Sequence, residues 1–586
     1  MQNDKLKLKI IFLAIIFGGI FGVAGNSLAA CVGPAQPAVV AAVAAASKGD
    51  TIQVCAGTAT WSTETTGADG YGHLLNITKG IALEGGIGGT TKIIAAGATD
   101  RGQILYYPDL DSITSDATFE FSGFTLDGDS TYKAQGSLRI INSSNSNAIS
   151  NIKIHNNILQ NSGVNGTMIM VDGPVYGVIY LNHFINVDYL VRPSGNDSIS
   201  WGIVPREYGT DVGLFVEDNL VSLTTTMEGG LFDDGQGSPG LVFRYNTEDL
   251  TNATLSGLWV NHGLQSMKSS LVTTGTATGG STTTLIDTAK NFVALGAKVG
   301  TLVYNTTKGQ YDLITSITTT TNTNDTLHFN AMGSANASGD SYRVGRDWDC
   351  GYEGHDLCDP TYINCQEWSN IKLEVYGNKI VNAPAFSNWI AHRGSWLLMF
   401  YNDNDSYYKP TITYNQYSCD SCQDPAGQND GSNYSQHVQN TYTWINYSGG
   451  SLMPMTKGFD FCSDASVGSP YTITQNVDYW NYTSSFDGTS GVGCGTLAQM
   501  NAINPGSGTN VGVGFWVTNQ SCSNVSTLIG AKGVGSENRS DDISGTLYKW
   551  NGNAWSVYYT PYTYPHPLRG EADTTSPTSP TGLAVE

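Results

Sequence analysis

The chain has 586 residues, of which 13% are charged, while 69 are glycine and 31 are tyrosine. This composition favours strands joined by tight turns and argues against a mainly helical protein. The formal net charge of −22 argues against nucleic acid as a partner, because it provides no positive surface that would displace the counterions of a phosphate backbone.

The first thirty residues are typical of an export signal. Lys5, Lys7 and Lys9 precede an apolar stretch, residues 10–23, and "NSLAA" then supplies the small residues that a signal peptidase requires. The apolar stretch is short for a membrane span, and no later one approaches the necessary length. We therefore expect a secreted or cell-surface bacterial protein with no transmembrane segment in the mature chain.

Two roles are open for Cys31. "LAAC", residues 28–31, resembles the lipobox of bacterial lipoproteins, in which the cysteine carries a lipid anchor. Alternatively, Cys31 forms a disulfide, with Cys55 as a candidate partner. All ten cysteines follow the signal, as expected in an oxidising compartment, and lipidation of one would leave an odd number.

Residues 38–61, "AVVAAVAAASKGDTIQVCAGTATW", predict a short alanine-rich helix, a turn at Gly49 and Asp50, and a strand. Such a helix would cover the first strands of a repetitive fold, whose unpaired edge otherwise promotes aggregation.

A short pattern of alternating apolar residues followed by asparagine recurs along the chain. It occurs at residues 152–159, 178–185, 214–221, 241–248, 373–380 and 397–404. The period of two indicates strands, and spacings that lie mostly in the twenties and thirties indicate a solenoid. We predict an all-β fold, a right-handed parallel β-helix in which each coil adds strands to the edges of the preceding coil.

The sixth position of the pattern predicts a ladder of stacked side chains. Alignment on the first apolar residue places Asn157, His183, Asn219, Asn246, Asn378 and Asn402 at this position. Asparagine tolerates the left-handed backbone of a sharp turn, and stacked amides form hydrogen bonds along the axis. We assign these residues a structural role.

The start of the chain resembles a known superfamily. The predicted helix followed by "GDTIQVCAG", residues 49–57, and later "ITKGIALEGG", residues 77–86, is similar to the opening of bacterial proteins of the pectate-lyase-like superfamily. The resemblance implies the β-helix fold and no particular activity, because enzymes acting on sugar chains and adhesins share this fold.

The expected domains follow from where the pattern holds. Residues 31–270 form the first part of the β-helix with its N-terminal cap, and residues 346–500 form the second part. Residues 271–345 are rich in threonine and short strands, which indicates a small inserted β module. Residues 501–570 form the C-terminal cap region. Residues 571–586 are a Ser/Thr/Pro linker ending in "PTGLAVE", which resembles the first strand of a fibronectin type III domain.

Two short motifs suggest hydrolysis of glycosidic bonds. "LFDDGQG" contains Asp233 and Asp234, and "VNHGLQS" contains His262. They resemble the aspartate pair and the His-Gly motif of polygalacturonases, which use carboxylate pairs as acid and base. The Asn-Thr-Asp and Arg-Ile-Lys motifs of that family have no convincing counterpart here. Adjacent aspartates in a glycine-rich turn also fit solvated turn formers or calcium ligands.

Arg393, in "AHRGSW", is a candidate proton-abstracting base of a lyase. That role requires burial and neighbouring cations to lower its pKa, because a free guanidinium stays protonated. The alternative is an ion pair with a carboxylate on the neighbouring coil.

Acidic residues are concentrated in "GRDWDCGYEGHDLCD", residues 345–359. Asp347, Asp349, Glu353 and Asp356 offer the oxygen ligands that calcium prefers. The spacing is not that of an EF-hand loop, and an acidic loop held by disulfides is an equal alternative.

Aromatic residues, among them Trp389, Trp396 and Tyr401, cluster in the second part of the repeat. They are candidates for stacking on sugar rings, although buried aromatics would give the same pattern. We expect an exported protein that interacts with a uronate or neutral extracellular polysaccharide, as a polysaccharide lyase or glycoside hydrolase. The alternative is a non-catalytic surface, matrix or adhesin protein.

Overall fold

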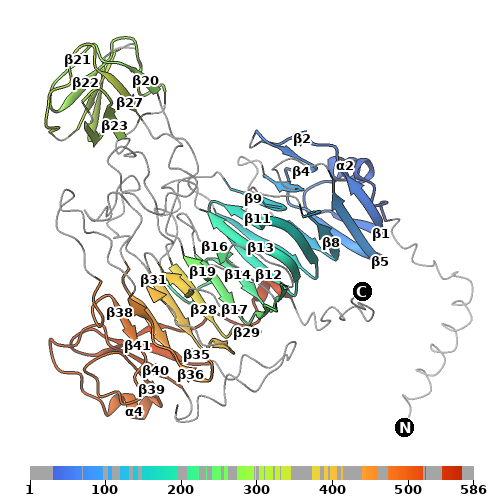
Figure 1. The fold of residues 1–586 in the computed structure, drawn as a ribbon, viewed down its shortest axis with the longest axis vertical. Helices are drawn as coiled ribbons and strands as arrows, with labels where there is room; N and C mark the ends of the chain where they lie inside the picture. Colours follow the sequence, from blue (N-terminus) through green and yellow to red (C-terminus); the bar gives the residue numbers. More distant parts are fainter. Residues whose placement is uncertain are drawn as a thin grey trace, which may run out of the picture.

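The structure is a computed structural model. It describes residues 31–68, 70–96, 103–108, 119–130, 136–142, 148–194, 207–223, 232–233, 240–251, 257–261, 273–295, 297, 302–308, 310–320, 324–329, 331–344, 372–382, 388–392, 396–405, 411–412, 438–457, 473–518, 522 and 544–570. The predicted signal and the fibronectin-like segment lie outside these ranges. The prediction of an all-β fold built on parallel strands is confirmed, because the largest element is an extended, mostly parallel sheet (Figure 1).

The strands of this sheet pair in three series, which we call the first, second and third stacks. The first stack consists, in pairing order, of β1 (Thr51–Trp61), β5 (Ala82–Ala95), β7 (Phe119–Ser122), β10 (Ile149–His155), β12 (Val175–Tyr180), β14 (Leu214–Glu217), β17 (Leu241–Arg244), β28 (Lys372–Tyr376), β31 (Trp396–Phe400), β34 (Thr441–Trp444) and β38 (Tyr479–Asn481).

The second stack continues from the ends of β1 and β5 through β8 (Phe124–Asp127), β11 (Ile158–Asp172), β13 (His183–Ser194), β15 (Leu220–Ser222), β18 (Thr247–Asp249), β29 (Lys379–Val381), β32 (Asp403–Asn404) and β35 (Tyr447–Ser448). The short strand β36 (Ser451–Leu452) pairs with β35 in the antiparallel sense.

The third stack contains β4 (Leu75–Ile77), β6 (Ile104–Tyr106), β9 (Leu138–Ile141), the second halves of β11 and β13, β16 (Phe232–Asp233), β19 (Gly257–Asn261), β30 (Asn388–His392), β33 (Thr411–Ile412) and β37 (Thr456–Lys457). The chain thus visits the first, second and third stacks in turn and then returns to the first.

Alternation along the first stack separates two hydrophobic clusters. In β31, Leu397 and Met399 belong to the large central core, while Leu398 and Phe400 belong to a second cluster that includes residues near the C-terminus. A strand directs successive side chains to opposite faces. The first stack therefore has an inner face toward the core and an outer face toward the C-terminal region.

Side-chain amides form a continuous row between the first and second stacks. Each Nδ2 group donates to the Oδ1 atom of the next asparagine at 2.9–3.1 Å, in the order Asn157, Asn182, Asn219, Asn246, Asn378, Asn402 and Asn446. All seven side chains are buried. Each Oδ1 that receives such a bond also accepts from the backbone N–H of the preceding asparagine, as Asn246 does from Asn219 at 3.0 Å.

The sequence alignment placed His183 in this row, and the structure corrects it to Asn182. The strand register pairs Ile152 with Gly177, so the equivalent of Ile152 lies one residue before Val178, from which the sequence pattern was aligned. His183 instead lies 2.9 Å from the hydroxyl of Ser222 through its Nε2 atom. Asn446 is a further member that the sequence pattern missed.

The ladder residues themselves do not adopt the left-handed backbone, which also corrects the expectation. That conformation belongs to the residue before each asparagine, for example Asp218 (φ 54°), Tyr245 (φ 58°) and Tyr401 (φ 52°). A non-glycine residue in this region costs roughly 1–2 kcal/mol. The hydrogen bonds of the asparagine amide that follows each such residue offset that cost. The turn and the ladder therefore form together.

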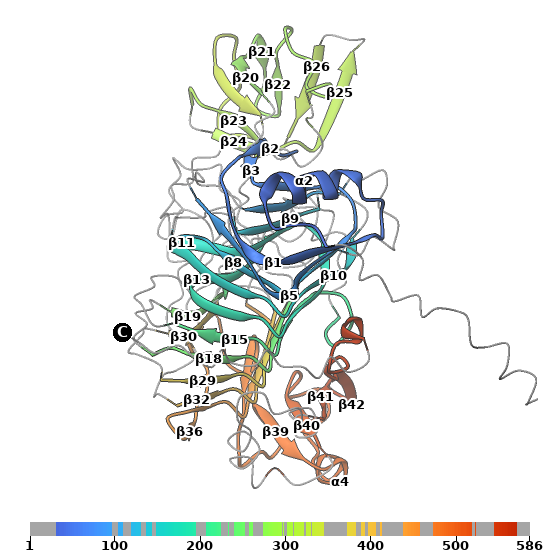
Figure 2. The ribbon, with the colours of Figure 1, turned by 90° about the vertical axis from the view of Figure 1, so that its right-hand side faces the viewer.

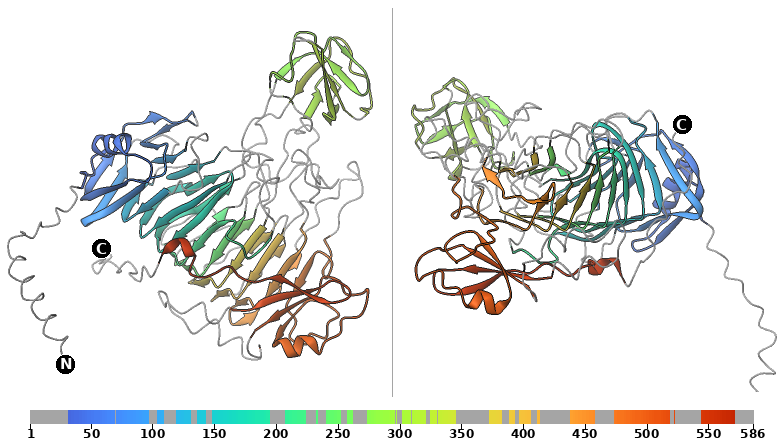
Figure 3. Two further views of the ribbon diagram at one scale, coloured as in Figure 1. Left: turned by 180° about the vertical axis from the view of Figure 1, so that it is seen from behind. Right: turned by 60° about the horizontal axis from the view of Figure 1, so that its bottom comes forward.

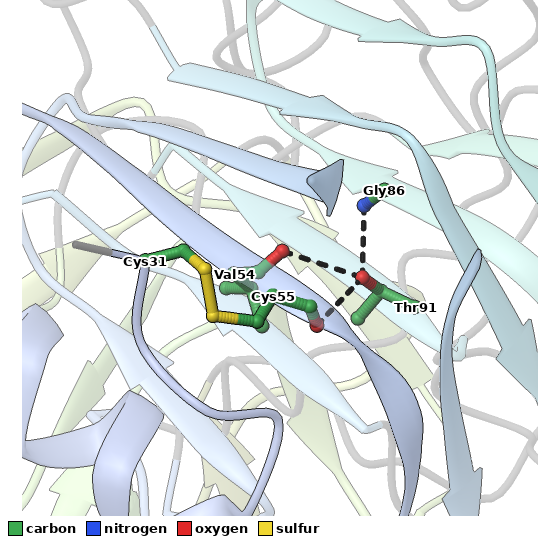
Figure 4. The surroundings of a disulfide bond; sticks show 5 residues. All are labelled: Cys31, Val54, Cys55, Gly86 and Thr91. Atoms are coloured by element: carbon green, nitrogen blue, oxygen red, sulfur yellow. Dashed lines mark hydrogen bonds between the residues drawn. A yellow bond between two sulfur atoms is a disulfide. The ribbon is translucent and has the colours of Figure 1, made fainter. Parts of the chain in front are cut away.

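A helix and a disulfide close the N-terminal end. Helix α2 (Gln36–Ala45) buries Val39 and Val43 against the core, where β1 and β4 lie. Cys31 is bonded to Cys55 of β1, and the Thr91 hydroxyl donates to the Cys55 carbonyl oxygen at 3.0 Å (Figure 4). A sulfur in a disulfide cannot also carry a thioether-linked lipid, so the structure favours the disulfide role of Cys31. The small antiparallel pair β2 (Thr65–Thr66) and β3 (Gly72–His73) lies nearby.

The segment predicted as an inserted module forms two four-stranded antiparallel sheets with a hydrophobic cluster of their own. Its strands are β20 (Thr273–Thr276), β21 (Gly279–Gly280), β22 (Thr284–Ile286), β23 (Leu302–Asn305), β24 (Gln310–Leu313), β25 (Ser316–Thr320), β26 (Asn324–His328) and β27 (Ser341–Val344). These strands stand apart from the large sheet in Figures 1 and 2.

The C-terminal region lies beside the outer face of the first stack (Figure 3). It contains β39 (Val492–Gly495), α4 (Leu497–Asn501), β40 (Gly514–Val517), β41 (Thr546–Trp550), β42 (Trp555–Tyr559) and the short helix η6 (Pro567–Arg569). A second disulfide joins Cys494 to Cys522. Such bonds form in oxidising compartments. Among the described residues, no helix is long and apolar enough to cross a membrane.

We expect the substitution Asn219→Leu to lower the free energy of unfolding by about 1–3 kcal/mol, because it leaves the amides of Asn182 and Asn246 buried without one partner each. Chemical denaturation measures this change. The matched control is Asn501→Leu, at an exposed position at the end of α4. Equal stability of the two variants would contradict a ladder that supports the fold.

Candidate functional site

The structure describes only some of the residues that the sequence suggested for function. Asp234, His262, Arg393 and the acidic residues Asp347, Asp349, Glu353 and Asp356 lie outside the described residues. Asp233, Trp389, Trp396 and Tyr401 lie within them. The described residues contain no group of three or more Asp, Glu, His or Cys side chains placed to hold a metal ion.

Asp233 is the last residue of β16 in the third stack. Its backbone is in register with Val260 of β19, which is in register with Ala391 of β30. The strands β19 and β30 end at Asn261 and His392, one residue before His262 and Arg393 in the sequence. The segments that carry the three candidate side chains therefore begin at the carboxyl ends of three neighbouring strands.

Basic residues of the third stack lie on the strands before β16. Arg139 of β9 forms an ion pair with Asp172 of β11 at 2.9 Å, and both side chains are partly accessible. Arg192 of β13 lies over the ring of Tyr189, and its strand pairs with β16 through Val191 and Phe232. Arg192 directly follows Val191, and Asp233 directly follows Phe232. The two residues therefore occupy equivalent positions on neighbouring strands. The sequence pattern did not indicate these arginines, because they lie outside the six segments that define the repeat.

Two of the three predicted sugar-stacking residues are enclosed by protein. Trp389 is 0% exposed within the central core, and Tyr401 is 2% exposed in the cluster that includes Trp516. Neither ring has a face open to a sugar chain, so this interpretation is wrong for these two residues. Trp396 is partly buried, and its ring lies 6.0 Å from that of Tyr208.

The outer face of the first stack carries a buried cluster of charges. Arg244 of β17 donates through its Nε and Nη2 atoms to the Glu217 carboxylate of β14, at 2.7 and 2.6 Å. It also donates to the Tyr376 hydroxyl at 2.9 Å. Its Nη1 and Nη2 atoms also donate to the carbonyl oxygens of Tyr562 and Thr563, at 2.8 and 2.9 Å. Both side chains of the ion pair are fully buried.

The other half of the charged cluster comes from the C-terminal segment. Arg569 of η6 reaches Glu217 at 2.9 Å and Asp218 at 2.5 Å. The Tyr564 hydroxyl donates to both oxygens of Asp218 at 2.8 Å. The backbone N–H of His566 donates to Glu217 at 2.9 Å. Two carboxylates and two guanidiniums thus balance each other in a buried volume.

Burial and pairing act in opposite directions on these groups. Burial raises the pKa of Glu217, but the charges of Arg244 and Arg569 outweigh it, and the pKa is lowered. For Asp218, burial and then the charge of Glu217 raise the pKa despite Arg569. Burial disfavours the cation of Arg244, yet the adjacent Tyr376 and Glu217 hold its pKa well above its usual range. Arg244 therefore stays a cation and cannot act as a proton-abstracting base.

Aromatic packing extends the contact along the same face. The Phe400 ring stacks on Trp444 at 4.2 Å between ring centres and lies 5.3 Å from that of Trp516. Tyr559 of β42 donates to Glu374 of β28 at 2.8 Å. The outer face from β14 to β34 is therefore occupied by the chain itself.

Comparison with known protein families finds no family model that matches this chain, and comparison with curated proteins finds no similar sequence. The assignment of a function therefore depends on the fold and on the chemistry of the faces described above.

We expect Arg244→Met to destabilise the protein by about 3–5 kcal/mol, because it leaves the Glu217 carboxylate buried without its closest cation. The double variant Glu217→Gln/Arg244→Met should be less destabilised than the sum of the two single variants, since no unpaired charge remains at this pair. Denaturant unfolding of the four proteins measures the coupling. Additive effects would contradict a direct interaction between the two charges.

Proposed function

We propose that this protein is an exported right-handed parallel β-helix of the pectate-lyase-like kind, which interacts with an extracellular polysaccharide through the face of its third stack. The β-helix is supported by the order in which the chain visits the three stacks and by the parallel pairing of each strand with its counterpart in the next repeat. In this proposal, residues 271–345 are an inserted accessory module and residues 501–570 close the C-terminal end.

The third stack is the face that we assign to the partner. The outer face of the first stack is covered by the C-terminal region from β14 to β34. The third stack, in contrast, carries the partly accessible Arg139 and has Arg192 on the strand next to Asp233. Guanidinium groups bind carboxylates in a bidentate manner. This observation favours a polymer that contains uronate over a neutral one.

The more specific part of this proposal is catalysis at the same face. The carboxyl ends of β16, β19 and β30 lie side by side, so the segments containing Asp233, His262 and Arg393 start from adjacent strands. A carboxylate pair of Asp233 and Asp234 would serve a hydrolase, and Arg393 would serve a lyase. The acidic residues from Asp347 to Asp356 would then supply oxygen ligands for calcium.

The second candidate function is a non-catalytic rod that binds polysaccharide at a cell surface or in a matrix. It is favoured by the incomplete polygalacturonase motifs, and by an interior in which hydrogen bonds of the amide ladder join the successive repeats from Asn157 to Asn446. The two candidates share the binding face and differ only in turnover.

Binding is tested by affinity electrophoresis in gels that contain a uronate polysaccharide or a neutral one. We expect Arg192→Ala to weaken retention in the uronate gel by roughly tenfold or more, because a hydrogen bond to a charged group contributes about 1.5–3 kcal/mol. The matched control, Arg343→Ala, removes an arginine from β27 of the inserted module. Equal retention of the two variants would contradict a binding site on the third stack.

Turnover is tested by incubating the secreted protein with the same polysaccharides, with calcium or with a chelator. A lyase releases unsaturated products that absorb in the ultraviolet, whereas a hydrolase releases only reducing ends. We expect Asp233→Asn to abolish hydrolase activity and Arg393→Ala to abolish lyase activity, because each removes the group that transfers the proton. Retention in the gel without either product would assign the rod function.

A further inference from the structure

The segment that follows β42, residues 560–570, runs along the outer face of the first stack and ends near β10 and β12. We call it the C-terminal strap. Its contacts with the body include the charged cluster and the cation–π contact of Arg569 with the Tyr180 ring at 4.7 Å. Figure 3 shows this segment following the first stack back toward its N-terminal strands.

His566 occupies the centre of the contact between the strap and the body. Its side chain is 4% exposed. Its ring centre lies 4.5 Å from that of Phe215 on β14 and 5.4 Å from that of Tyr562 within the strap. Its backbone N–H donates to Glu217. The imidazole therefore packs against two aromatic rings that also contact each other at 5.5 Å, beside a buried ion pair.

The hydrogen bonds of His566 require a neutral ring. Its Nδ1 atom accepts the backbone N–H of Leu568 at 3.2 Å and so caps η6, which assigns the ring hydrogen to Nε2. A second proton would have to bind Nδ1, where it would face the Leu568 N–H group. Among the described residues, Nε2 has no hydrogen-bond partner that would stabilise a cation.

The charged groups around His566 come from four parts of the chain. Glu217 of β14 and Asp211 before it favour a cation, whereas Arg244 of β17 and Arg569 of η6 oppose one. Burial has the largest effect and lowers the pKa of His566 to about 4. The geometry and the electrostatics therefore agree that protonation is unfavourable in the docked strap.

We propose that His566 is a pH-sensitive lock, which holds the C-terminal strap on the first stack when neutral and releases it when protonated in a mildly acidic medium. Release would expose the guanidinium N–H groups of Arg244 that now donate to the carbonyl oxygens of Tyr562 and Thr563. This device is independent of the polysaccharide face on the third stack.

The direction of the pH effect follows from the lowered pKa. A free histidine titrates near 6.5, so docking is fully favourable above that pH and weakens as the pH falls toward 4. At pH 5 the opening equilibrium of the strap should increase by roughly 30-fold over its value at high pH.

Hydrogen–deuterium exchange of strap peptides in the full-length protein, at pH 7.5 and pH 5.0 and corrected for intrinsic rates, tests the proposal. We expect wild-type protection to fall by more than tenfold at pH 5.0. In His566→Asn, a side-chain oxygen can still cap η6 but does not titrate, so its protection should change little with pH. Asp218 and Glu217 are present in both proteins. A difference in pH dependence between the two proteins therefore comes from His566 and not from these carboxylates.

The matched control is His183→Asn, which removes a half-buried histidine of the second stack that is bonded to Ser222. It should keep the wild-type pH dependence of the strap. The proposal is overturned if wild-type protection is independent of pH, or if His566→Asn loses protection in acid as the wild type does. Protection of the strap at pH 7.5 also shows whether the strap is docked in His566→Asn. An undocked strap in this variant at pH 7.5 would contradict the role of the residue 566 side chain as a cap of η6.

Discussion

The row of buried amides fixes the register on which the rest of the molecule depends. Each inner member, such as Asn219, donates to one neighbour and accepts from the other. A shift of one strand by a single residue would break these bonds and also move its apolar side chains to the opposite face. An unpaired buried amide costs free energy comparable to a lost hydrogen bond. The ladder and the alternation of side chains therefore enforce the same alignment of all three stacks.

Once the register is fixed, each outer face consists of straight rows of side chains. One row of the first stack reads Gln53, Glu84, Ser122 and His155 at its N-terminal end. The same row continues with Tyr180, Glu217, Arg244, Tyr376, Phe400 and Trp444. After Tyr180 the row continues with the ion pair of Glu217 and Arg244 and then with three aromatic residues, and the C-terminal region covers the ion pair and these aromatic residues. The position of that region is thus determined by the order of residues along the row.

The sequence was sufficient to predict the strands, because the pattern that indicates a strand is local. Period-two alternation and the asparagine near each strand end lie within eight residues, and most of the ladder was predicted from them. The exchange of His183 for Asn182 arose because Gly177, which has no apolar side chain, is the residue in register with Ile152. The docking of the strap could not be predicted, since Glu217 and His566 are 349 residues apart. The burial of Trp389 and Tyr401 follows from packing that period-two alternation does not encode.

The buried charges of the first stack are best understood as determinants of position. A buried ion pair often contributes less stability than an apolar replacement of similar volume, because both charges lose their hydration. Stacked rings such as Phe400 and Trp444 supply apolar contact, but flat aromatic surfaces tolerate sliding along a row. The directional bonds from Arg244 to Tyr562 and from Arg569 to Asp218 are satisfied in a single alignment. We infer that the aromatic part provides the affinity of the C-terminal region for the body, and that the charged cluster selects its register.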